Sequence, residues 1–379
     1  MKCNAWTYAL LGVGVISLPS VMNAEEKASS VLTALSSTTI SGYVDTSAQW
    51  NIGTGNLNVP NYSFGGPGKA DGFNLNVVKL SLEKPTETGD TWAAGYKVES
   101  FVGPDAVSLA TGSGSDFALK QAYVALHAPI GSGLDLKMGV WDTIIGYEVT
   151  DAPSNNNFTR SYGYTIEPTT HTGLLGTYAF CSAISASVGV ADTFGPVINA
   201  RAPLPKAESY KAYLGSVTLT APESWGALGG ATVTGGVING FNAGVAGDQT
   251  SWYVGTSLNT PIKALKFGAS YDYQGVSDQP LRGSGYANAT AVYAALKLSE
   301  KATFFARGEY ATTDIDSFGT AGLRKVVAAT GTLQYDLWAN VLTRLEFRWD
   351  HAADASTPYG DASDKNNSYI VMANVAYKF

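Results

Sequence analysis

The sequence predicts an all-β fold, a transmembrane antiparallel up-and-down β-barrel of about 16 strands. Three observations predict it: segments of period-two alternation along most of the chain, connections that alternate between short and long, and a C-terminal segment that ends on an aromatic residue. In that last segment, apolar side chains from Tyr369 to Phe379 alternate with a mixed face that carries Asn374 and Lys378. A strand with one face in lipid has this period, and a terminal aromatic is typical of the membrane interface.

The N-terminus has the features of a cleaved secretory signal, which we assign to residues 1–24. Lys2 precedes an apolar run from Tyr8 to Leu18, and this run is shorter than the roughly 20 residues that a membrane-spanning helix needs. Residues 25–37 show weak helical spacing and are interpreted as a periplasmic lead-in or a short plug. The transmembrane barrel domain is therefore expected over residues 38–379.

The composition suits a barrel that faces lipid outside and water inside. The chain has 42 glycines and 21 tyrosines, and only 15% of its residues are charged. Its formal net charge of −7 argues against nucleic acid as a partner, because phosphate binding needs a basic surface. Once the signal has left with Cys3, Cys181 is the single cysteine, so no intramolecular disulfide is expected.

The predicted strands are bounded by clusters of Gly, Pro, Asn, Asp or Ser, and each has about the nine to eleven residues, or slightly more, of a tilted membrane-spanning strand. The spans are 38–50, 72–85, 91–102, 117–128, 134–142, 171–181, 184–194, 209–221, 229–241, 250–260, 263–275, 286–299, 301–313, 324–337, 339–351 and 367–379.

The connections are expected to alternate between short and long without exception. Short ones include 129–133 and 182–183, and long ones include 51–71 and 143–170. Short periplasmic turns opposite long outer loops are typical of bacterial outer-membrane barrels, and a soluble β-sandwich has no reason to separate loop lengths in this way. An even strand count places both ends of the barrel on the periplasmic side.

Alternation assigns the charged side chains of the strands to the lumen, because a Lys or Arg facing lipid at mid-membrane costs about 2–4 kcal/mol. The predicted pore-lining residues are Lys79, Lys97, Glu99, Lys137, Arg307, Glu309, Arg344, Glu346 and Arg348. Two readings stay open: the charges line a water-filled pore, or they pair across neighbouring strands and tie the barrel together. A count of the wall charges comes out slightly basic, which hints at a weak preference for anions.

The longest connection, residues 143–170, is too long for a simple crossing and is expected to have a function. One hypothesis is that it folds inward and narrows the lumen, with Glu148 and Arg160 as the constriction charges. The alternative is an extracellular surface loop.

Several segments resemble the OmpL-like β-barrel porin family of outer-membrane channels. The similarity is densest between residues 40 and 173, and later residues resemble the family mainly in architecture. The segments are Ile40-Ser-Gly-Tyr-Val-Asp-Thr-Ser, Phe73-Asn-Leu-Asn-Val-Val-Lys-Leu-Ser-Leu-Glu-Lys-Pro85, Leu119-Lys-Gln-Ala-Tyr-Val124, Gly133-Leu-Asp-Leu-Lys-Met-Gly139, Ile145-Gly-Tyr-Glu-Val149 and Glu167-Pro-Thr-Thr-His-Thr-Gly173. Members often carry a basic residue after the glycine that corresponds to Gly139, whereas this chain has Val140. The resemblance implies passive transport.

No catalytic site is expected. The three histidines, His127, His171 and His351, are separated along the chain, and the adjacent Asp350 and His351 point to opposite faces of a strand. No metal-binding or phosphate-binding motif occurs, so we expect neither enzymatic activity nor a cofactor.

The predicted function is that of an outer-membrane porin, a channel for passive diffusion of small hydrophilic solutes and ions. The expected partners are outer-membrane lipid and lipopolysaccharide, the solutes, and other copies in a homotrimer by analogy with porins of this size. The alternative is a barrel sheath or a surface structural protein that binds a periplasmic or extracellular partner, for example in an electron-transfer conduit.

Overall fold

The structure is a computed structural model that describes residues 37–379 except 54, 61–66, 88, 112–115, 204–209, 244–246, 280–282, 316–317, 319 and 321. The predicted signal, 1–24, and all of the predicted lead-in except Ser37 lie outside the described residues.

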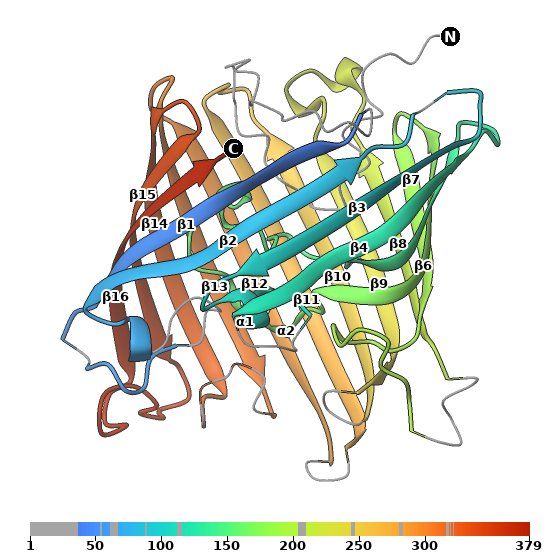
Figure 1. Ribbon diagram of the computed structural model, residues 1–379. Helices are drawn as coiled ribbons and strands as arrows, with labels where there is room; N and C mark the ends of the chain where they lie inside the picture. The colour runs from blue at the N-terminus through green and yellow to red at the C-terminus, as the bar shows by residue number, and fades with distance from the viewer. Residues whose placement is uncertain are drawn as a thin grey trace.

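Sixteen antiparallel strands form one closed barrel in which each strand pairs with its neighbours in sequence and β1 pairs with β16 (Figure 1). The predicted fold class and strand number are confirmed. The strands are β1 (Thr39–Asn51), β2 (Gly72–Lys84), β3 (Ala93–Val102), β4 (Phe117–Ala128), β5 (Leu134–Asp142), β6 (Thr170–Cys181), β7 (Ile184–Ala191), β8 (Ala212–Thr220), β9 (Thr232–Asn242), β10 (Gly247–Asn259), β11 (Leu265–Gln279), β12 (Gly283–Lys297), β13 (Ala302–Thr313), β14 (Lys325–Trp338), β15 (Val341–Ala352) and β16 (Asn367–Lys378).

The expected strict alternation of connection lengths is wrong at two places. Residues 243–246 and 280–282 connect strands at the end where long loops were expected, yet both are shorter than 221–231 at the opposite end. The reason is that β10, β11 and β12 extend further than their alternation predicted, so strand replaces loop. The other connections at that end, such as 143–169, are long.

The barrel closes between the two ends of the chain. Gly42 N–H donates to Phe379 O at 2.9 Å, and Phe379 N–H donates back to Gly42 O at 3.0 Å. A Cβ on Gly42 would lie 2.0 Å from Lys79 O and 2.9 Å from Phe379 Cζ, so glycine is needed for this close approach. The sequence predicts that the C-terminal strand, residues 367–379, pairs with residues 38–50 to close the barrel, and this pairing is confirmed.

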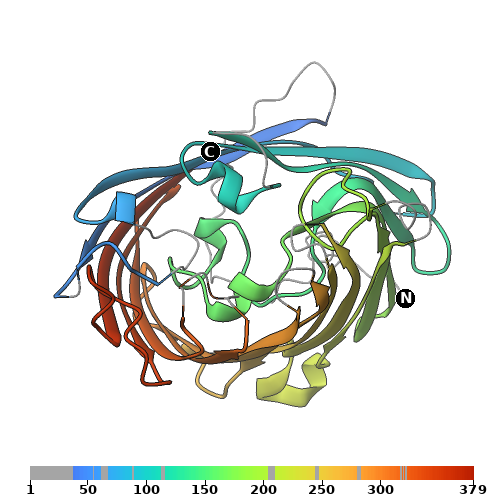
Figure 2. The same cartoon turned by 90° about the horizontal axis from the view of Figure 1, so that it is seen from below.

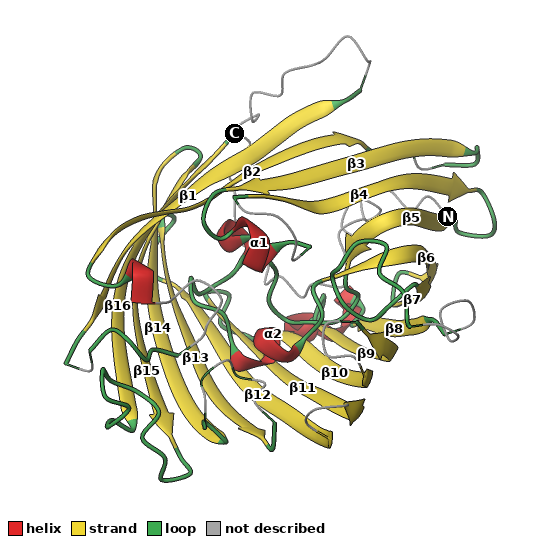
Figure 3. Cartoon of the chain, turned by 60° about the horizontal axis from the view of Figure 1, so that its bottom comes forward, coloured by secondary structure: helices red, strands yellow, loops and turns green. Residues whose placement is uncertain are grey.

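The short helices lie mainly in the connections. They are η1 (Pro67–Lys69), α1 (Ala106–Leu109), η2 (Ala152–Ser154), α2 (Tyr162–Ile166) and η4 (Glu223–Leu228). No helix in the described part of the chain is long and apolar enough to cross a membrane. Seen along the barrel, α1 and α2 lie inside the ring of strands (Figure 2, Figure 3).

Strand β15 shows how the sequence sets the two faces. Leu345 and Phe347 are 57% and 47% exposed on the outer surface, whereas the intervening Glu346 is 1% exposed. Period two places these side chains on opposite faces. The charged face therefore points into the barrel and the apolar face toward lipid, which spares the cost of a charge in hydrocarbon.

Candidate functional site

The segment that connects β5 and β6, residues 143–169, lies inside the barrel (Figure 2, Figure 3). We call it the lumen segment; it contains η2 and α2. Its α2 contacts β11, β12 and β13 on the inner wall. The sequence left open whether this connection folds into the lumen or forms an extracellular surface loop. In the structure it folds into the lumen.

Apolar packing fixes the first part of the lumen segment. Ile144, Ile145 and Tyr147 belong to a buried cluster with wall residues such as Leu214 and Tyr293. The rings of Tyr147 and Tyr293 stack with centroids 4.0 Å apart. Side chains of the segment and the wall thus pack together here, and their burial stabilises the docked segment by about 25 cal/mol per Å² of apolar surface.

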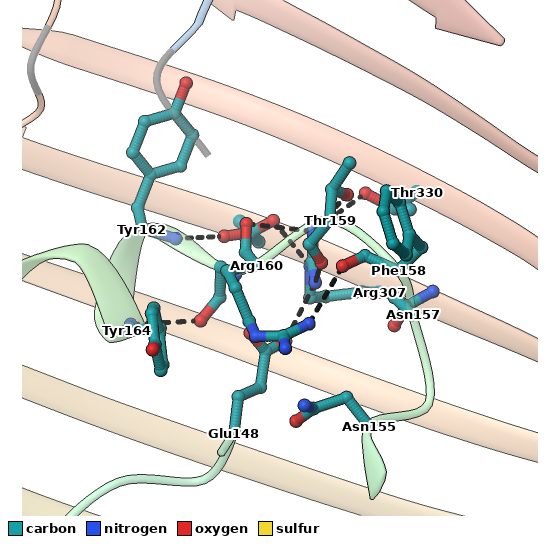
Figure 4. A network of polar contacts seen from close by, with 12 residues as sticks. Glu148, Asn155, Asn157, Phe158, Thr159, Arg160, Tyr162, Tyr164, Arg307 and Thr330 are labelled. Carbon is teal, nitrogen blue, oxygen red and sulfur yellow. Dashed lines mark hydrogen bonds and ion pairs between the residues drawn. The ribbon is translucent and has the colours of Figure 1, made fainter. Parts of the chain in front are cut away.

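Glu148 and Arg160, the predicted constriction charges, are both buried (Figure 4). Glu148 Oε1 pairs with Arg307 Nη1 at 2.8 Å, and its Oε2 accepts from Ser161 N–H at 2.7 Å. Arg160 donates to the carbonyls of Phe158 and Thr150 at 2.8 and 2.9 Å. The structure therefore places both side chains within the fold of the segment, not facing open water.

Wall carboxylates accept the backbone N–H groups of the lumen segment. Glu346 Oε2 accepts from Phe158 N–H at 2.6 Å, and its Oε1 accepts from Thr159 N–H at 2.9 Å. Glu309 Oε2 accepts from Tyr162 N–H at 2.7 Å. Irregular backbone at membrane depth needs such partners, because an unpaired buried N–H costs free energy.

Wall arginines bind the carbonyls of the same segment. Arg344 donates to Ala152 O at 2.9 Å and Asn155 O at 2.5 Å. Arg348 donates to Arg160 O at 2.6 Å. Each guanidinium carries several donors in a fixed fork, so one side chain can bind two carbonyls.

The five predicted pore-lining residues on β13 and β15 therefore face inward but lie under the lumen segment. The exposed fractions of Arg307, Glu309, Arg344, Glu346 and Arg348 are 2%, 6%, 3%, 1% and 1%. Alternation reports only the side of a strand, so it could not distinguish a charge that faces water from one that is covered. What covers that side is a segment that begins more than a hundred residues earlier.

The other four predicted pore-lining residues lie on β2, β3 and β5. Lys79 pairs with Glu99 at 2.9 Å and with Asp151 of the lumen segment at 2.6 Å, and Lys97 pairs with Glu99 at 3.0 Å. Lys137 Nζ lies 5.0 Å from the centre of the Tyr123 ring. These pairs are more exposed to solvent than those on β13 and β15, since the side chains of Asp151 and Lys97 are 31% and 21% exposed.

Strand β4 carries a pair that the sequence did not reveal. A register shift between β3 and β4 falls at Glu99/Ser100, opposite the stretch that contains Lys120. Lys120 is 2% exposed and forms an ion pair with Asp142. Strict alternation with the inward Gln121 would have turned Lys120 to lipid, so only the observed bulge accounts for its position.

His127 and Asp135 form another pair that the sequence did not reveal, because the two residues lie opposite each other on neighbouring strands and not side by side in the chain. His127 Nδ1 lies 2.7 Å from Asp135 Oδ1, and its Nε2 lies 3.1 Å from Gly89 O. Both ring nitrogens of His127 lie against acceptors. The side chain therefore connects the turn that contains Gly89 to the start of β5 at one end of the barrel. Among the described residues, no group of three or more His, Cys, Asp or Glu side chains could hold a metal ion.

The family model described as "Putative beta-barrel porin-2, OmpL-like" matches residues 37–379. The chain belongs to this family. It is therefore a porin of the bacterial outer membrane, as the resemblance of its segments implied. A search of the curated proteins finds no significant match.

Solved structures show that the barrel architecture of this OmpL-like porin is shared. An anion-selective porin from Comamonas acidovorans superposes with a TM-score of 0.62 at 12% identity, over 90% of this chain and 99% of that one. The outer-membrane channel DcaP of Acinetobacter baumannii gives 0.60 at 14% identity, over 90% and 97%. A trimer form of OmpT from Vibrio cholerae gives 0.53 at 13% identity, over 90% and 100%.

Proposed function

We propose that the lumen segment is the constriction of this porin and that small hydrophilic solutes and ions pass between it and the wall formed by β2 to β5. The observation that carries this is the difference in exposure between the two walls. The ion pair of Arg307 and Glu148 has side chains 0% and 6% exposed, whereas Lys97 and Glu83 are 21% and 39% exposed. Permeating solutes meet the second pair and not the first.

The proposal revises the charge preference hinted at by the sequence. Arg307, Arg344 and Arg348 contributed to the basic excess of the wall count, and Arg160 lies in the lumen segment. All four arginines are at most 3% exposed. Their donors bind carboxylates or backbone carbonyls of the protein. We therefore propose no anion preference for this channel, although one structural neighbour is an anion-selective porin.

Planar-bilayer recording tests the constriction. Removing residues 151–160 from the lumen segment should raise the single-channel conductance, because the segment would no longer occupy the lumen. A matched deletion of residues 361–364, in the connection between β15 and β16, should leave it unchanged. Equal conductance of the wild-type protein and the 151–160 deletion, with both barrels folded, would defeat the proposal.

We also propose what the sequence led us to expect of the signal, the oligomeric state and enzymatic activity. Residues 1–24 serve as a cleaved signal, which N-terminal sequencing of the mature protein tests.

The barrel assembles as a homotrimer in lipid and lipopolysaccharide, which is supported by the trimeric neighbour and tested by light scattering in detergent. We expect no enzymatic activity, because the family model and the structural neighbours are porins and channels. The sheath alternative is disfavoured because α1 and the lumen segment occupy the interior.

A further inference from the structure

Charged side chains on β2 and β3 form a series of ion pairs that ends on the lumen segment. Lys97 pairs with Glu83 at 3.5 Å and with Glu99 at 3.0 Å. Lys79 pairs with the same Glu99 at 2.9 Å and with Asp151 of the lumen segment at 2.6 Å. We call this series the charge chain; its order is Glu83, Lys97, Glu99, Lys79 and Asp151. Three carboxylates against two ammonium groups leave it one net negative charge, and a carboxylate stands at each end.

The two ends of the charge chain are its most exposed members. The side chains of Glu83 and Asp151 are 39% and 31% exposed. Those of Lys97 and Lys79 are 21% and 11% exposed, and that of Glu99, which lies between the two lysines, is 3% exposed. Water in the passage therefore contacts the terminal carboxylates more than the ammonium groups that they neutralise.

Two further lysines lie on the same wall. Lys120 of β4 is 2% exposed and pairs with Asp142, whose side chain is 24% exposed, so the carboxylate is again the outer partner. Lys137 of β5 is half-buried, and its Nζ lies over the ring of Tyr123, 5.0 Å from the ring centre. The wall thus presents three exposed carboxylates, which Lys137 opposes only in part.

An ion in the passage interacts most strongly with the outermost charges, because the Coulomb energy falls with distance. Acidic side chains that line a pore favour cations in this way. On the other side of the lumen, the four covered arginines lie among four covered carboxylates, so this set adds no net charge. These carboxylates are Glu148, Glu309, Glu346 and Asp350.

We propose that this channel prefers cations, because carboxylates are the outermost charged groups of the wall that permeating ions meet. The inference rests on the proposed function, since it concerns ions that pass between the lumen segment and the wall formed by β2 to β5. The preferred solutes are small inorganic cations and small protonated amines.

Reversal potentials across a planar bilayer with a gradient of KCl test the preference. At about 0.1 M salt, where the screening length is about 10 Å, the dilute side should be positive at zero current, and K⁺ should be more permeant than Cl⁻ by up to about fivefold. The preference should weaken at about 1 M, where the screening length is about 3 Å. Glu83→Gln combined with Asp151→Asn should remove it, and the barrel should still fold because both lysines keep Glu99 as a partner. Asp364→Asn, a change of an exposed loop carboxylate, should keep the wild-type value.

A wild-type reversal potential of zero, or of the opposite sign, would overturn the cation preference. A folded double variant that keeps the wild-type potential would overturn it as well. Labelling with a water-soluble carbodiimide and an amine, read by mass spectrometry, is a second measurement that needs no current. Glu83 and Asp151 should react faster than the covered Glu309, and equal protection of all three would overturn the inference. A protein that conducts under no condition would instead overturn the proposed function, and the labelling would still decide whether the carboxylates are the exposed charges.

Discussion

Arg307 of β13 and Glu148 of the lumen segment lie 159 positions apart in the chain, and their side chains form an ion pair of 2.8 Å. Arg307 also pairs with Glu309 at 2.6 Å and donates to Thr159 O at 2.6 Å. A buried ion pair compensates its desolvation only when further hydrogen bonds complete it, and here they do. This network connects the barrel wall to the lumen segment (Figure 4).

Arg307→Met should release the lumen segment, because it leaves Glu148 buried without its cation and leaves Glu309 only Arg348, 3.9 Å away. Loss of one partner of a buried pair costs about 3–5 kcal/mol in the free energy of unfolding. Urea unfolding in detergent micelles measures it. In a double-mutant cycle with Glu148→Gln, the combined change should be smaller than the sum of the two, and strict additivity would contradict the coupling.

Glu346→Gln should loosen the tip of the lumen segment. The carboxylate accepts from Phe158 N–H, Thr159 N–H and the Thr332 hydroxyl, and the amide would turn an N–H toward one of these donors. An unsatisfied buried donor costs about 1–3 kcal/mol. Hydrogen exchange at residues 158 and 159 should rise accordingly. Glu87→Gln, in an exposed position between β2 and β3, serves as the control and should leave these amides unchanged.

Gly42→Val should prevent closure of the barrel, because its side chain would meet the Lys79 carbonyl and the Phe379 ring. The folded barrel, measured as the heat-modifiable band on a denaturing gel, should be largely lost. Gly215→Val in β8 is the matched control, since no atom lies within 4 Å of a Cβ at that position. A normal yield of folded barrel from Gly42→Val would show that the closing pair tolerates a wider spacing.

Acid should separate the two outer connections that meet at Asp354. Burial alone would raise the pKa of this carboxyl, but hydrogen bonds from Ser356 and from the N–H groups of Arg324 and Lys325 outweigh it and hold the pKa below its ordinary value. A lowered folded pKa gives stability that is present above the unfolded pKa, about 3.9, and lost as the pH falls through the folded one. The amides of Arg324 and Lys325 should therefore lose protection from exchange in acid, relative to Asp354→Asn at the same pH. Equal protection in both proteins across that range would contradict this role.

The candidate site was only partly predictable. Alternation gave the inward direction of Arg344, Glu346 and Arg348, because a charge in lipid is costly wherever the strand lies in the barrel. It could not indicate that these side chains bind the backbone of residues 152–160. Backbone N–H and C=O groups are the same at every position, so the sequence has no signal for which of them a distant side chain will bind.

By itself, the sequence determined the barrel: sixteen strands, their approximate ends, the face of most side chains and the pairing of the C-terminal strand with the first. Each strand reports this locally, through a period of two residues that lipid on one side enforces. Only the tertiary structure decided where residues 143–169 lie, that the wall arginines are covered, and that Arg307 pairs with Glu148. These outcomes depend on contacts between segments more than a hundred residues apart, and no local period encodes them.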